Sequence, residues 1–252
     1  KRHGRYTKKG MKKGVNFSDR LGKAVKQKNN PSVLGLDPKL EYIPESIRKK
    51  YAKDCDNHFQ AAANSILEFN RRLIDATCDI IPAIKPQLAY YEMYGAEGLR
   101  ALEETIAYGR QKGMIVIADG KRNDIGTTAE AYSKAFLGTT EIFGKTCRAF
   151  DADALTVNAY LGIDGIKPFL DDCRKEEKGV FILVKTSNPS SGQIQDMRLE
   201  DGRTVYEMMA DFVREWGEPL TGENGYSSVG AVVGATYPEQ LKELRKRMPN
   251  SW

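Results

Sequence analysis

Residues 114–121 read MIVIADGK, a short apolar run that ends in charged side chains. Five other runs of this kind are spread along the chain, separated by longer stretches with helical periodicity. The runs are almost continuously apolar rather than alternating, which is typical of strands buried on both faces of a parallel sheet. The other five runs span 32–37, 80–87, 154–160, 179–187 and 228–235.

The stretches between the runs favour helices. Apolar residues recur there with a period of 3.6, so that Phe59, Ile66 and Leu73 share one face of a predicted helix. A helix buries such a face against its neighbours. Helices are therefore expected over 59–77, 97–112 and 203–216, with a last one opening at Pro238.

Strands and helices in alternation define the fold class as α/β. A complete (β/α)8 TIM barrel takes roughly 250 residues, but only six strand-like runs are visible among these 252 residues. Two folds remain open on this pattern. One is an open, doubly wound sheet; the other is a (β/α)8 barrel whose last one or two βα units are absent from this chain. In either case we expect residues 14–252 to form a single domain.

The net charge of +5 is concentrated at one end of the chain. Residues 1–13 hold seven Lys and Arg and no acid, whereas the rest carries 32 basic and 34 acidic side chains, a net charge of −2. We expect 1–13 to be a flexible tail, native or added before a native start at Met11, and not a nucleic-acid-binding segment.

Several classes of protein are excluded by composition. No stretch approaches the roughly 20 apolar residues of a membrane-spanning helix, and no secretory signal follows the basic start. Two histidines, His3 and His58, cannot build a multi-histidine metal site. The four cysteines contain no CxxC pair and favour a reducing compartment, so we expect a cytoplasmic protein.

Charged side chains gather where the predicted strands end. Asp119 and Lys121, two residues apart in a strand, project to the same face. Lys85 closes the preceding run, and Asp124 follows in the turn to the next helix. We expect an alternating array of Lys85, Asp119, Lys121 and Asp124, in which each ammonium is flanked by carboxylates.

Such an array suits carbanion chemistry without a metal or an organic cofactor. An ammonium held beside a carbon that develops negative charge stabilises it and can then deliver a proton. A neighbouring carboxylate crowds a substrate carboxylate and favours its loss as CO₂. The alternative on these residues alone is a structural salt-bridge network.

The stretch 119–128, DGKRNDIGTT, closely resembles the DxKxxDIxxT motif of orotidine 5′-phosphate decarboxylases. The resemblance extends over about residues 30–252 and is greatest to the longer, bacterial-type subfamily. Other matching segments, in the family's order, are GLDP at 35–38, IKPQ at 84–87, TVN at 156–158 and KTSNP at 185–189.

This resemblance implies a (β/α)8 barrel that pairs into a homodimer with two shared active sites. It implies cofactor-independent conversion of orotidine 5′-monophosphate to uridine 5′-monophosphate and CO₂, the last step of de novo pyrimidine synthesis. By the same resemblance, Lys121 is the proton donor to C6, Asp119 faces the departing carboxyl group and Lys85 touches the ribose. Asp124 and Thr128 reach across the dimer to the neighbour's ribose.

The resemblance also assigns substrate contacts outside this cluster. Asp37 matches an acceptor of a ribose hydroxyl, Ser187 matches the hydroxyl that reads the pyrimidine amide edge, and Ile125 matches an apolar contact to the ring. Gln87 is a weaker match for a residue that holds the substrate or neighbouring polar groups.

The chain departs from the family pattern after the sixth run. The family's phosphate-gripping segment and phosphate-binding arginine have no match before Trp252, so we expect the chain as given to be incomplete. Two alternatives stay open. One is a Mg²⁺-dependent sugar-phosphate decarboxylase or lyase of the same superfamily, although Lys85 stands where that group is expected to carry a metal-binding acid. The other is a truncated, non-catalytic barrel that binds nucleotide or only dimerises.

Overall fold

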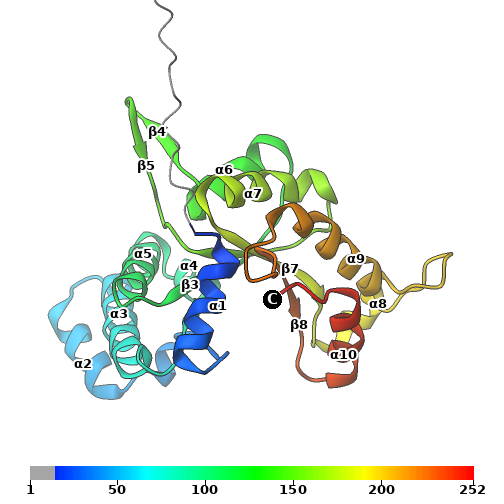
Figure 1. Ribbon diagram of the computed structural model, residues 1–252. Coiled ribbons are helices and arrows are strands. Elements are labelled where there is room, and N and C mark those ends of the chain that lie inside the picture. The colour runs from blue at the N-terminus through cyan, green and yellow to red at the C-terminus, as the bar shows by residue number, and fades with distance from the viewer. Residues whose placement is uncertain (1–14) are drawn as a thin grey trace, which may run out of the picture.

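The computed structural model describes residues 15–252, so the predicted basic tail at 1–13 lies outside the described residues. The described chain forms a six-stranded parallel sheet that curls into part of a barrel (Figure 1). Each strand overlaps one predicted run. In sheet order they are β1 (Val33–Leu36), β2 (Ala83–Pro86), β3 (Ile115–Arg122), β6 (Ala154–Val157), β7 (Gly179–Lys185) and β8 (Val229–Val233).

The strand order decides between the two folds that the pattern left open. The parallel strands are neighbours in their order along the chain, without the reversal that a doubly wound sheet requires. Right-handed crossovers in one direction place the connecting helices on one face of the sheet, as in a barrel. The fold is therefore a partial (β/α)8 barrel, in which β1 and β8 are the two ends of the sheet order in the described residues.

Helices cover the convex face of the sheet, and the expected ones over 59–77, 97–112, 203–216 and from Pro238 are confirmed. Phe59 differs from expectation: the residue is 57% exposed, whereas Ile66 is fully buried. A 20-residue helix is about 30 Å long and overhangs a four-residue strand, so its first turn lies beyond the core. The helices are α1 (Phe17–Lys28), α2 (Glu45–Asp54), α3 (His58–Thr77), α4 (Ala89–Glu92), α5 (Gly95–Gln111), α6 (Gly126–Phe136), α7 (Ile163–Glu176), α8 (Gly192–Gln195), α9 (Val205–Gly217) and α10 (Pro238–Arg247).

The two faces of the sheet have separate apolar cores. Val116 and Ala118 pack in the core that includes the outer helices, whereas Ile115 and Ile117 pack with Phe17 and Leu21 of α1. Helix α1 thus covers the concave face near the strand starts (Figure 1). Alternation along each strand therefore decides which residues enter the barrel interior.

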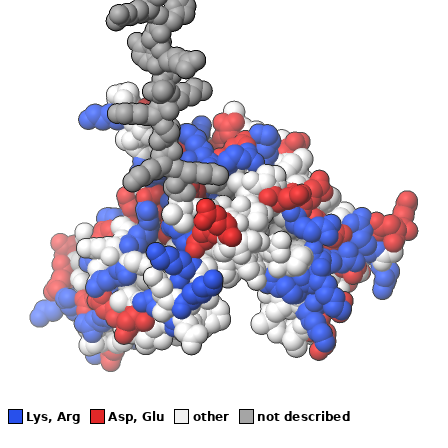
Figure 2. Space-filling view, in the orientation of Figure 1, with Lys and Arg blue, Asp and Glu red and all other residues white. Residues whose placement is uncertain are grey.

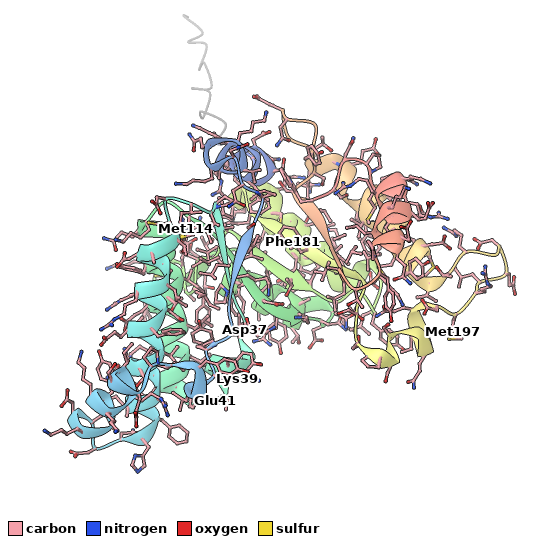
Figure 3. All side chains as sticks on the ribbon, turned by 90° about the horizontal axis from the view of Figure 1, so that it is seen from below. Asp37, Lys39, Glu41, Met114, Phe181 and Met197 are labelled. Atoms are coloured by element: carbon pink, nitrogen blue, oxygen red, sulfur yellow. The ribbon has the colours of Figure 1, made fainter. Side chains whose placement is uncertain are left out.

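The two ends of the barrel differ in what they expose. Figure 3 shows Met114, directly before β3, and Asp37, directly after β1, at opposite ends of the sheet. Phe17 occupies the Met114 end, and its ring lies so close to Gly179 that a Cβ there would be 2.2 Å from Cδ1 of the phenylalanine. Only glycine fits under this ring. The opposite end, where the strands finish, remains available for a site.

A projecting hairpin was not expected from the sequence. Strands β4 (Thr140–Ile142) and β5 (Lys145–Cys147) pair antiparallel and extend away from the body between α6 and β6 (Figure 1). Phe143 and Gly144 form its tip, both with positive φ, which matches the turn that two-residue hairpins prefer. The strands are three residues each, too short for an alternating pattern to be recognised.

Charge is mixed over the surface. On the face seen in Figure 2, acidic and basic side chains are interspersed, and basic ones gather toward α9 and α10. Helix α10 ends in Arg245, Lys246 and Arg247, where cations complement the helix dipole. Among the helices of residues 15–252, none combines the length and apolar character that crossing a bilayer demands.

The packing of α1 gives a stability prediction. Phe17 is 1% exposed and meets Phe181 edge to face, with ring centroids 6.2 Å apart. Phe17→Ala should lower the free energy of unfolding by about 3–5 kcal/mol, because the cavity forms under a helix that covers the strands. Urea denaturation measures it, and the exposed Phe59→Ala should stay within about 0.5 kcal/mol of the parent. Equal stability of both variants would show that α1 does not close this end.

Candidate active site

Strand register brings the predicted polar residues into one row inside the barrel. Ile115 and Ile117 face the interior, so Asp119 continues on the same side at the carboxyl end of β3. Gln87 forms a parallel bridge with Asp119. On the other side, Ala118 is opposite Leu155, which places Thr156 opposite Asp119. Side chains from three neighbouring strands, β2, β3 and β6, or from the residue directly after them, therefore meet at Asp119.

The carboxylate of Asp119 is the centre of this cluster of polar side chains. Its Oδ2 accepts from Lys85 Nζ at 2.7 Å and from Gln87 Nε2 at 3.0 Å. Its Oδ1 accepts from Lys121 Nζ and from Thr156 Oγ1, both at 2.7 Å. A carboxylate has about four lone-pair positions, so these four donors fill its hydrogen-bonding capacity.

The surroundings keep Asp119 ionised. Burial by itself raises the pKa of this carboxyl, but the hydrogen bonds from Lys121, Lys85 and Thr156 outweigh burial and hold the pKa below its usual value. The side chain of Asp119 is only 6% exposed, whereas those of Lys85 and Lys121 are 34% and 43% exposed. The cluster therefore presents two ammonium groups to solvent and shields its one carboxylate, which favours an anionic ligand.

A bulge in β3 aims Lys121 at Asp119. The pairing of β3 with β6 shifts between Ala118 and Arg122, and Lys121 has φ 47°, in the left-handed region. For a non-glycine residue this conformation costs about 1–2 kcal/mol. The N–H of Lys121 leaves the regular ladder and donates to Thr156 Oγ1 at 3.0 Å. Alternation predicted the shared face, but nothing in the sequence predicted the bulge.

Asp124 lies apart from the cluster of its own chain, so one chain does not by itself form the expected array of four. Its Oδ1 accepts from the backbone N–H of Ile125 at 2.8 Å, and within residues 15–252 it forms no ion pair with Lys85 or Lys121. The chain turns into α6 directly after Asp124, which carries this side chain away from the interior row. Ile125 is 53% exposed, and Thr128 is exposed on α6. Three members of the array therefore come together within one chain.

Asp37 and Ser187 lie on the same rim without joining the cluster. Asp37 is exposed directly after β1, and Figure 3 shows it at the strand ends. It stands beside β2, because the N–H of Gln87 donates to Leu36 O at 3.0 Å. Ser187 follows β7 and packs on Gly234, where a Cβ would be 2.8 Å from Cβ of the serine. Both residues therefore follow strands of the sheet at the same end as Asp119.

Two contributors were not assigned from the sequence. Thr156 is one: it lies in the matching segment TVN at 156–158 and places a hydroxyl at an inward position of an apolar strand, but it was given no role. Lys185 is the other: it is 2% exposed and donates from Nζ to Asp196 Oδ1 at 2.7 Å. A register shift between Leu183 and Lys185 turns that lysine toward the following segment instead of Asp119. This bond connects Lys185 to the polar segment 188–204 that follows Ser187.

The site and fold together define a barrel enzyme whose reactive groups stand at the strand ends, with a Lys–Asp–Lys cluster as their centre. Residues 33–250 match the family described as orotidine 5′-phosphate decarboxylase / HUMPS family, and the chain belongs to that family. The resemblance to orotidine 5′-phosphate decarboxylases that the sequence motifs indicated is thereby confirmed.

Relatives are similar over nearly the whole chain. An orotidine 5′-phosphate decarboxylase of Caldicellulosiruptor bescii is 45% identical, covering 94% of this chain and 78% of its own length. One of Rhodopirellula baltica is 43% identical, covering 94% and 76%. Among solved structures, a putative orotidine-monophosphate decarboxylase of Toxoplasma gondii has a TM-score of 0.75 at 32% identity, covering 94% of this chain and 76% of that one.

The lowered pKa of Asp119 makes a pH-dependent stability prediction. An unfolded aspartate has a pKa of about 3.9, so the stabilisation by Asp119 is present above that pH and is lost as the pH falls through the lower folded value. Asp119→Asn should destabilise the protein by about 1–3 kcal/mol at pH 6, and by less at pH 3. Denaturant titrations at both pH values measure this.

The matched control is Asp54→Asn, which removes an exposed carboxylate at the end of α2, far along the chain from the cluster. A destabilisation by Asp119→Asn that is the same at both pH values would contradict the ionised carboxylate.

Proposed function

We propose that this chain catalyses the cofactor-independent decarboxylation of orotidine 5′-monophosphate to uridine 5′-monophosphate and CO₂, the closing step of de novo pyrimidine synthesis. The observation that carries the proposal is the Lys121–Asp119–Lys85 cluster, with both N···O distances at 2.7 Å, at the carboxyl end of the sheet. This places an ammonium and a carboxylate side by side where substrates of barrel enzymes bind.

The chemistry needs only groups of the protein. The bond between C6 of the pyrimidine and its carboxyl carbon breaks, the electron pair stays on C6, and CO₂ leaves. The ammonium of Lys121 stabilises the developing negative charge and then gives its proton to C6. The ionised Asp119 faces the substrate carboxylate, and repulsion between the two charges is relieved as CO₂ departs.

Neighbouring residues hold these two groups and the substrate. Lys85 and Gln87 both bond Oδ2 of Asp119, which leaves its other oxygen to Lys121 and Thr156. In this proposal Lys85 also meets the ribose, which its partial exposure allows. The remaining substrate contacts are the ribose hydroxyls with Asp37, the pyrimidine amide edge with Ser187 and the ring face with Ile125.

The Mg²⁺-dependent sugar-phosphate reaction is the less favoured alternative. That reading needs an acidic ligand on β2, and β2 instead presents Lys85, whose charge is engaged by Asp119. An ammonium at this position repels a divalent cation and attracts an anionic nucleotide. A non-catalytic barrel is separated from both enzymes by a single measurement of turnover.

We further propose a cytoplasmic homodimer whose two active sites are shared. Within residues 15–252 neither Asp124 nor Thr128 bonds Lys85 or Lys121, so a role at the ribose requires a second chain. The same rim exposes apolar side chains that a partner can cover: Tyr160 is 78% exposed and Leu161 44%. The four cysteines are free, as a reducing compartment requires.

Lys121→Ala tests the assignment of the proton donor. Removing one preorganised charged group typically costs about 10²–10³ in rate, and the lost proton donor adds to that, so we expect no measurable decarboxylation while the fold and dimer persist. The assay follows the absorbance of the orotidine ring, with uridine 5′-monophosphate identified as the product.

Lys23→Ala, on the exposed surface of α1, is the matched control and should keep parental turnover. Parental turnover by Lys121→Ala would overturn the mechanism.

Sharing of the sites is tested by mixing two inactive variants, Lys121→Ala and Asp124→Ala. In a hybrid dimer one site holds both defects and the other neither. With random pairing of equal amounts, about a quarter of parental activity should return, because half of the dimers are hybrids with one intact site each. Native mass spectrometry confirms hybrid formation. No recovery in confirmed hybrids would mean that each site is built from one chain.

A further inference from the structure

The hydroxyl of Thr156 joins the two reactive groups of the site through bonds of defined direction. Thr156 is 3% exposed, and its Oγ1 lies 2.7 Å from Asp119 Oδ1 and 3.0 Å from the backbone N of Lys121. A hydroxyl carries one hydrogen, and an ionised carboxylate only accepts. Thr156 therefore donates to Asp119 and accepts from the N–H of Lys121.

These bonds close a ring that includes both ends of Lys121. Its N–H donates to Thr156, Thr156 donates to Oδ1 of Asp119, and the same Oδ1 accepts from Lys121 Nζ at 2.7 Å. The backbone of Lys121 is left-handed at the bulge, where the regular ladder offers its N–H no partner. The hydroxyl supplies that partner and thereby fixes the turn from which the ammonium is aimed.

Strand register explains why this position can serve both residues. β3 and β6 are in step at Ala118 and Leu155, so the next residues, Asp119 and Thr156, are opposite each other. The neighbours Leu155 and Val157 are fully buried apolar residues of the outer core. A single hydroxyl thus interrupts an apolar strand at the point where the bulge begins.

We propose that Thr156 is a positioning residue for the decarboxylation, which sets the backbone of Lys121 and the orientation of the Asp119 carboxylate without touching substrate. This role rests on the function proposed above. Rate in a preorganised site depends on holding charged groups in the geometry of the transition state before the substrate arrives. Loss of the hydroxyl should therefore slow the chemical step more than it weakens substrate binding.

Thr156→Val tests the proposal, since valine keeps the shape and removes the hydroxyl; Thr156→Ser, which keeps the hydroxyl, is the matched control. We expect Thr156→Val to lower kcat by about 10–100-fold with KM changed less than about threefold, and Thr156→Ser to stay within about threefold of the parent in kcat. The acid limb of the kcat profile should move to higher pH only in Thr156→Val. The reason is that the pKa of Asp119 rises when one of the donors that lower it is lost.

A merely structural role predicts a different pattern. It lowers the amount of folded enzyme but leaves the acid limb in place. An unshifted limb, an unchanged kcat in Thr156→Val, or an equal loss in Thr156→Ser would each overturn the proposal.

A substrate-free measurement separates this inference from the proposed function. Inactivity of the parent enzyme on orotidine 5′-monophosphate would contradict the proposed function but not the link between Thr156 and Asp119. The link to Asp119 is then read from denaturant unfolding between pH 3 and pH 6. The pH-dependent part of the stability should be lost at higher pH in Thr156→Val than in the parent and in Thr156→Ser. Identical pH dependence in all three proteins would refute the coupling between Thr156 and Asp119.

Discussion

The site depends on one carboxylate with four donors. Asp119 is almost inaccessible to solvent, and an isolated buried carboxylate would be protonated or would destabilise the fold. Lys85 and Gln87 from β2 hold one oxygen, while Lys121 from its own strand and Thr156 from β6 hold the other. These bonds connect three neighbouring strands at their carboxyl ends. Their geometry keeps the charge on Asp119 and fixes two ammonium groups beside it.

The alternation of side chains between the two faces of each strand explains how polar groups reach the interior of an apolar barrel. Ile115 and Ile117 bury against α1, and the next residue on that side is Asp119, where the apolar contacts of α1 no longer reach. On this side of β3 the side chains therefore change from apolar to polar between Ile117 and Asp119. Two irregularities then alter the simple alternation. At the bulge before Arg122 the ammonium of Lys121 stays on the side of Asp119, whereas the shift before Lys185 turns that residue away toward Asp196.

Stability and reactivity are placed at opposite ends of the same strands. At the strand starts, Phe17 packs on Gly179 and against Phe181, and apolar burial dominates. At the strand ends, ion pairs and hydrogen bonds hold Lys121 and Asp119 with partly exposed ammonium groups, which is a costly arrangement to desolvate. The separation lets one end supply stability while the other holds charges in positions that chemistry requires.

The sequence by itself determined the six strands, the principal helices and the reactive pair, because apolar periodicity and the spacing of Asp119 and Lys121 are local properties of the chain. The family resemblance added the expected barrel. Only the tertiary structure decided that Thr156 completes the cluster and that Asp124 bonds neither lysine of its own chain's cluster, although the resemblance had assigned Asp124 to a neighbouring chain. The first outcome depends on register between strands and on a left-handed residue at a bulge, and the second on the turn into α6. Neither leaves a periodic signal in the sequence, because each arises only when separate segments pair in three dimensions.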